Sequence, residues 1–167
     1  MLDFSVEKLP YIKKERGTAL KKMGIETVSD LLNYFPRAYE DRSKVRLVND
    51  LSFDQPSSYI LTVGTSVRNA KLKGGLIISK FRAFDESGAL EIVFYNSPFV
   101  KDVFHVGEVF RFYGKPVIKS GLISLSSPKY EPYSESYQPK DIIPVYPLSG
   151  GLTSKFINKI TLSVIDS

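Results

Sequence analysis

Aromatic and basic residues recur at alternate positions along the middle of this 167-residue chain, and together these two residue types can hold a nucleic-acid strand. Cations neutralise phosphates, whereas aromatic rings stack on bases with little regard to base type. In an extended strand, successive side chains point to opposite faces, so the apolar set of each strand must face the core. The other face would then present Lys80, Arg82, Phe84, Tyr95, Arg111, Tyr113 and Lys115.

Tyr95 and Phe99 form the sharpest pair among these candidates. Tyr95 ends an expected strand, Phe99 lies four residues later, and Pro98 between them restricts the chain direction. Two rings on such a stiff corner could project together as a wedge on which bases stack. Two simpler explanations stay open, because exposed tyrosines are ordinary in strands and Phe99 could instead plug the end of a β-barrel.

The remaining candidates have weaker expected roles. We predict contacts to the phosphate backbone from Lys80, Arg82, Lys101, Arg111 and Lys115, and additional stacking on Phe84 and Tyr113.

The elements that must position these side chains follow from hydrophobic alternation and turn residues. Period-two patterns predict strands at 59–67, 77–84, 89–95, 109–117 and 122–126. A short helix over 97–104, with Pro98 at its first position, separates the third strand from the fourth. Three strands, a helix and two strands make the order of an OB-fold, a five-stranded, partly open Greek-key barrel that binds oligonucleotides. Another small β-barrel or a sandwich is the alternative.

The ends of the chain differ in character from this middle part. The first 50 residues are expected to be helical, with one helix ending at Gly24 and a second opening at a capping box that starts at Thr27. Residues 128–150 are rich in Pro, Tyr and Ser and suggest a connector, and a helix begins at about Thr153. We predict an α+β chain with three parts: 1–50 helical, 51–130 barrel, and 131–167 connector with the start of a helix.

Composition excludes several classes of site. The net charge of +5 and pI of about 9.3 favour an anionic partner. The chain has no Cys and a single His, His105, so thiolate and multi-histidine metal sites are excluded. Gly114-Lys115 is followed by Pro116, and no phosphate-binding loop is visible. We expect no metal, no cofactor, no catalysis and no membrane span in this chain, and a cytoplasmic location.

Three stretches of the chain resemble, in the same order, the RecG family of bacterial ATP-dependent DNA helicases. LLNYFPRAYEDR at 31–42 is similar to the family's LLxxxPRRYEDR pattern, and DESGALEIVFYN at 85–96 is similar to DxxGxLxLxFFN. IPVYPL at 143–148, followed by Gly151 and Leu152, resembles the PVYPxxxGL connector. Two departures are Ala38 in place of the second Arg, and a segment at 9–17 without the family's glycine spacing, which weakens the case for phosphate binding by the N-terminal helices.

The resemblance implies that the barrel is the wedge domain of such a helicase. The family remodels stalled replication forks and Holliday junctions, and two aromatic side chains four residues apart cap the bases that its wedge separates. Tyr95 and Phe99 match that spacing. The motor domains that use ATP and Mg would then lie beyond Ser167, and the expected partners are forks, Holliday junctions, single-stranded segments and those motor domains. A free-standing single-strand-binding OB-fold protein and a protein-interaction OB module are the alternatives.

Overall fold

The protein is described by a computed structural model for residues 3–136 and 140–166, and it consists of two compact units. One unit combines Met1–Glu40 with Ile142–Ser167, and the other is Asp41–Asp141. The three-part division expected from the sequence therefore differs from the structure. The N-terminal and C-terminal segments share one core, in which Leu20 and Leu31 pack with Tyr146, Ile157 and Ile160.

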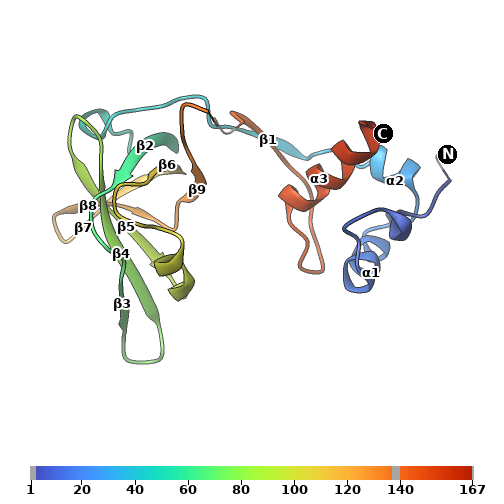
Figure 1. Cartoon of the computed structure of the whole chain (residues 1–167), viewed down its shortest axis with the longest axis horizontal. Coiled ribbons are helices and arrows are strands. Elements are labelled where there is room, and N and C mark those ends of the chain that lie inside the picture. Colours follow the sequence, from blue (N-terminus) through green and yellow to red (C-terminus); the bar gives the residue numbers. More distant parts are fainter. Residues whose placement is uncertain (1–2, 137–139, 167) are drawn as a thin grey trace. The chain divides into compact units, whose positions relative to one another are not determined.

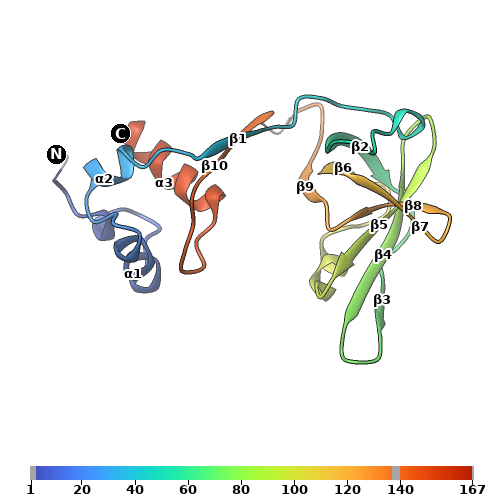
Figure 2. The ribbon, with the colours of Figure 1, turned by 180° about the vertical axis from the view of Figure 1, so that it is seen from behind.

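The central unit is built almost entirely from strands (Figures 1 and 2). Its elements are η2 (Val48–Asp50), β2 (Ser57–Val63), β3 (Arg68–Lys71), β4 (Ile77–Phe84), β5 (Ala89–Tyr95), η3 (Pro98–Asp102), β6 (Val109–Gly114), β7 (Pro116–Lys119), β8 (Leu122–Ser126) and β9 (Lys129–Pro132).

The pairing of these strands gives the expected OB-fold order. β4 pairs with β5, and β2 pairs with both β4 and β6. β8 runs parallel to β5, and β9 runs antiparallel to β6. Residues 127 and 128 separate β8 from β9, so the chain passes directly from the β5 side of the sheet to the β6 side, as in a partly open barrel. The predicted fold class is confirmed. The expected strand over 109–117 ends at Gly114, and β3, β7 and β9 are strands that the sequence patterns did not indicate.

The barrel boundaries extend beyond the expected 51–130 for two structural reasons. At the start, the Val48 N–H donates to Asp85 Oδ2 over 2.8 Å, which fixes η2 against the turn between β4 and β5. At the end, β9 continues the sheet into the stretch that had been expected to be a connector.

An aromatic cluster fills the barrel. Phe104 is 2% exposed, and its ring lies 4.7 Å from Phe81, 4.8 Å from Phe110 and 4.8 Å from Tyr130, measured between centroids. Such close ring pairs add to the stabilisation that comes from burial alone. The cluster fixes which face of each surrounding strand points inward.

The described residues of the other unit form three α-helices, one short 3-10 helix and a small two-stranded sheet. Its elements are η1 (Val6–Lys8), α1 (Lys14–Lys22), α2 (Val28–Leu32), β1 (Ala38–Asp41), β10 (Ile142–Val145) and α3 (Ser154–Ile165). The predicted helix end is confirmed at Gly24, whose φ is +78°. The predicted capping box is also confirmed: Thr27 Oγ1 accepts the Asp30 N–H, and Asp30 Oδ2 accepts the Thr27 N–H.

The turn between β4 and β5 is organised by the Asp85 carboxylate. Oδ1 accepts hydrogen bonds from the Ser87 N–H, the Ser87 hydroxyl and the Gly88 N–H, while Oδ2 accepts the Val48 N–H. Burial acts to raise the pKa of Asp85, but these hydrogen bonds outweigh it and hold the pKa below its ordinary value of 3.8. The carboxylate therefore stabilises the fold in its ionised form.

We expect Asp85→Ala to lower the free energy of unfolding of the barrel unit by about 1–3 kcal/mol near neutral pH, because four donors lose a charged acceptor. The depressed pKa contributes stability above about pH 4 that is lost as the pH falls through the folded-state value. The wild type should consequently lose more stability between about pH 5 and pH 2 than the variant does. Urea unfolding followed by circular dichroism measures both effects, with Glu86→Ala in the same turn as the control. Equal acid sensitivity in wild type and Asp85→Ala would contradict this account.

Candidate nucleic-acid interface

The outer face of β4 and β5 presents the predicted basic and aromatic side chains. In β4, Ser79, Phe81 and Ala83 are buried, while Lys80, Arg82 and Phe84 are exposed. In β5, Leu90, Ile92 and Phe94 are buried, and Tyr95 on the other face is half-buried. The alternation predicted from the sequence is confirmed for β4, and in β5 it holds except at Val93, which is buried although it lies on the same face as Glu91 and Tyr95.

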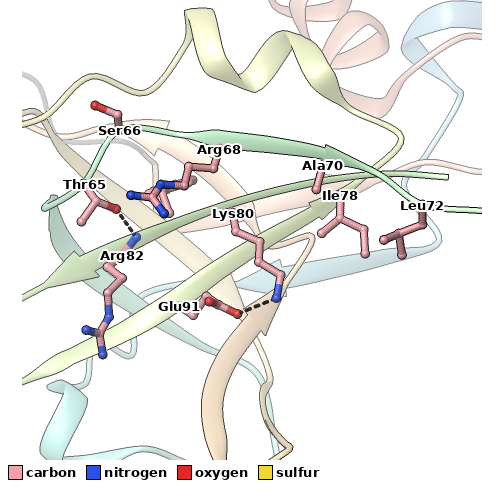
Figure 3. Close-up of a pocket in the computed structure, with 10 residues that line it drawn as sticks. Thr65, Ser66, Arg68, Ala70, Leu72, Ile78, Lys80, Arg82 and Glu91 are labelled. Carbon is pink, nitrogen blue, oxygen red and sulfur yellow. Dashed lines mark hydrogen bonds and ion pairs between the residues drawn. The ribbon is translucent and has the colours of Figure 1, made fainter.

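A groove of about 600 Å³ lies on this outer face, where β3 pairs with β4 (Figure 3). Arg68 lies directly opposite Lys80 in the ladder, and Arg82 lies on the next outward position of β4. The Lys80 ammonium is 3.4 Å from Glu91 Oε1, so one of the three cations is partly neutralised. The groove keeps a net positive charge, which suits a phosphate chain.

The floor of the groove is apolar and leads towards Tyr95. Ala70, Ile78 and Tyr95 lie in one row across β3, β4 and β5, since Ala70 pairs with Ile78 and Ile78 pairs with Tyr95. The basic side chains of Lys80 and Arg82 therefore lie at one end of this surface, and the Tyr95 ring lies at the other. The sequence patterns missed Arg68, because they ended the preceding strand at residue 67 and did not indicate β3 as a separate strand before the turn.

The corner between β5 and η3 places a second ring in solvent. Phe99 is 58% exposed, whereas Val100 and Phe104 after it are 0% and 2% exposed. Val100 and Phe104 close the end of the barrel, so the explanation in which Phe99 plugs the barrel is wrong. Pro98 is the first residue of η3, as expected.

The other predicted contacts have different surroundings. Lys101 is exposed on η3, and Lys115 is exposed between β6 and β7. Phe84 is 44% exposed. Tyr113 is half-buried and lies beneath the Arg42 guanidinium, which is 5.3 Å from the ring centroid. Because β2 and β4 separate β6 from β5, Tyr113 and Lys115 belong to a different part of the barrel surface from Tyr95.

The phosphate contact predicted for Arg111 is wrong, because the Arg111 side chain is only 3% exposed. Its Nη1 donates to Asp141 Oδ1 over 2.6 Å, and its Nη2 donates to Glu131 Oε2 over 3.2 Å and to the Lys140 carbonyl. Glu131 lies directly opposite Arg111 on β9, a strand that the sequence patterns did not reveal. The guanidinium holds the last strand to the barrel and is not available to DNA.

We expect Arg111→Met to lower the free energy of unfolding by about 1.5–3 kcal/mol, because three hydrogen bonds from a charged donor are lost. Lys115→Met, which removes an exposed cation next to the same strand, should stay within about 0.5 kcal/mol of the wild type. Urea unfolding followed by circular dichroism compares the two variants. A smaller loss of stability in Arg111→Met than in Lys115→Met would show that the ion pairs with β9 contribute little.

Neither a metal site nor a membrane-spanning helix is found in the part of the chain that the structure describes. No three acidic or histidine side chains there come together in a way that would hold a metal ion. None of the described helices has the length and apolar character needed to cross a bilayer.

Known proteins are similar to this chain in both sequence and fold. The chain is 30% identical over 155 residues to the ATP-dependent DNA helicase RecG of Thermotoga maritima, covering 87% of this chain and 19% of the relative. It is 34% identical over 152 residues to that of Borreliella burgdorferi, covering 86% of this chain and 22% of the relative. The chain thus spans about a fifth of the length of these relatives.

A solved structure of RecG bound to a three-way DNA junction matches 99% of this chain and 23% of that chain, with a TM-score of 0.87 and 25% identity. The family model of the RecG wedge domain matches residues 9–167. The chain therefore belongs to the RecG wedge domain family.

Proposed function

We propose that this chain is the branched-DNA-binding wedge of an ATP-dependent helicase that remodels stalled replication forks and Holliday junctions. The observation that supports this most directly is the exposed ring of Phe99, on a corner that follows a positively charged groove. The similarity to a RecG structure solved with a three-way junction supports the same substrate class.

The proposed mechanism is steric strand separation. A motor in the rest of the protein, using ATP and Mg, draws duplex DNA towards the wedge. At the branch point, bases that leave the duplex stack on Tyr95 and Phe99 instead of on each other, which offsets part of the free energy lost on unstacking. Arg68, Lys80, Arg82 and Lys101 hold the phosphates of the freed strand.

This division of labour assigns no bond-breaking step to the residues of this chain. Its residues would bind and orient DNA, while nucleotide hydrolysis would belong to the motor domains. Since the proposed substrate is bacterial chromosomal DNA, we place the protein in the cytoplasm.

We expect Tyr95→Ala and Phe99→Ala each to weaken binding to a three-way junction by about fivefold or more, because each removes a stacking surface for an unpaired base. Binding to a linear duplex of equal length should change little, since it offers no unpaired base at a branch. Fluorescence anisotropy with both DNAs measures the preference. Phe53→Ala is the matched control, because Phe53 is also exposed in the barrel unit. An unchanged junction preference in both variants would rule out the wedge assignment in favour of a general DNA-binding or protein-binding OB domain.

We expect Arg82→Gln to weaken binding to junction and linear DNA alike and to reduce the slope of log K against log salt by about 0.7–0.9, the value for one phosphate contact. Lys44→Gln makes the same change of charge at an exposed position before β2 and should leave the slope unchanged. Anisotropy titrations at several salt concentrations give both slopes. Equal slopes for wild type and Arg82→Gln would remove Arg82 from the phosphate-binding set.

A further inference from the structure

Two sets of hydrogen bonds hold the corner that displays Phe99. The first set involves the Asn96 and Ser97 side chains and the backbone of Asn96. Asn96 adopts φ +50°, a conformation that asparagine tolerates better than most residues. Its N–H donates to the Ile77 carbonyl over 2.8 Å, and its Oδ1 accepts the Ile77 N–H over 3.1 Å. Ser97 Oγ donates to the Tyr95 carbonyl over 3.1 Å. These bonds extend the β4–β5 ladder one residue beyond Tyr95.

The second set is donated by side chains of β3 and β4, the hairpin against which η3 packs. Ser79 Oγ donates to the Ser97 carbonyl over 3.4 Å, at the long limit for such a bond. Asn69 Nδ2 donates to the Pro98 carbonyl over 3.2 Å. The bond from Asn69 reaches furthest along the corner, to the residue immediately before Phe99.

The hydrogen bond to the Pro98 carbonyl affects the orientation of Phe99 because of where that carbonyl lies in the backbone. The oxygen of Pro98 and the nitrogen of Phe99 belong to one planar peptide unit. A donor fixed on that oxygen therefore orients the plane from which the Phe99 side chain departs. Tyr95 needs no such support, because the ladder with β4 already fixes its backbone.

Asn69 also links the corner to the groove. Arg68 and Ala70 face the groove, whereas Asn69 lies opposite the buried Ser79 and points to the other face of β3, towards η3. Asparagine has a low strand propensity, so Asn69 in the middle of β3 is locally unfavourable. Its hydrogen bond to the Pro98 carbonyl gives a reason for asparagine at this position.

We propose that Asn69 is a positioning residue, whose side-chain amide fixes the corner that presents Phe99 and ties it to the strand bearing Arg68. This inference rests on the proposed function, since it assigns to Asn69 an effect on junction binding that acts through Phe99.

The test compares Asn69→Asp with Asn33→Asp in this same chain. Asn69→Asp keeps the size of the side chain but replaces the amide donor with a carboxylate. Asn33→Asp makes the same change in the other unit, where Asn33 Nδ2 donates to the Ser29 carbonyl over 2.9 Å. Asn69→Thr serves as a second variant, because threonine favours strands and has no amide. Thermal melting by circular dichroism verifies that all three variants fold.

Two readouts report on the corner. The first is the ratio of affinities for a three-way junction and for linear duplex DNA. The second is the fluorescence of 2-aminopurine placed at the branch point, which is quenched when the base stacks. We expect both Asn69 variants to lower the affinity ratio by about twofold to tenfold, the range for one hydrogen bond, and to weaken the quenching. Asn33→Asp should alter neither readout.

A double-mutant cycle separates positioning from a general structural effect. In a Phe99→Ala background, Asn69→Asp should cause no further loss of junction preference, because the ring it positions is absent. An additional loss of the same size in that background would overturn the proposal. So would an unchanged affinity ratio in Asn69→Asp and Asn69→Thr when Phe99→Ala lowers it, a result that leaves the wedge assignment intact. No change in any of these variants would overturn the wedge assignment and the role of Asn69 together.

Discussion

The packing of rings around Phe104 is the constraint on which the proposed interface depends. Phe104 closes the end of the barrel just after η3, and Val100 takes the inward position within η3 itself. Phe99 is therefore left outside on the same short helix. The same cluster holds Phe81 and Phe94 inward, which turns Lys80, Arg82 and Tyr95 towards solvent by strand alternation. One buried ring cluster thus determines which side chains of β4, β5 and η3 face the proposed interface.

Sequence reasoning succeeded where the information was local. The alternation in β4 and β5, the capping box at Thr27 and the helix end at Gly24 each depend on residues within a few positions of one another. It failed for Arg111, because the partners that bury its guanidinium, Glu131 and Asp141, lie 20 and 30 residues away. Pairing of distant segments also explains why the two-unit division was missed. The roles proposed for Arg68 and Asn69 follow from the pairing of β3 with β4, which the sequence patterns did not indicate.

The basic side chains of this chain fall into two groups, those that form ion pairs inside the barrel unit and those that line the groove. The buried cations Arg42 and Arg111 face Glu131 and stabilise the barrel, so they contribute to the net charge without being offered to a ligand. Arg68 and Arg82 line the groove, where the acidic side chain of Glu91 is paired with Lys80. Net charge alone therefore overstates the basic surface, and the placement of three groove cations matters more than the total of +5.

The central claim is that unpaired bases at a branch point stack on Tyr95 and Phe99, and ring currents report such stacking directly. The decisive measurement is a set of aromatic proton–carbon NMR spectra of this chain with and without a three-way DNA junction. We expect the ring resonances of Tyr95 and Phe99 to move upfield on binding, while those of the buried Phe104 and Phe112 stay in place. Saturating junction DNA that leaves the Tyr95 and Phe99 resonances unmoved would contradict the account.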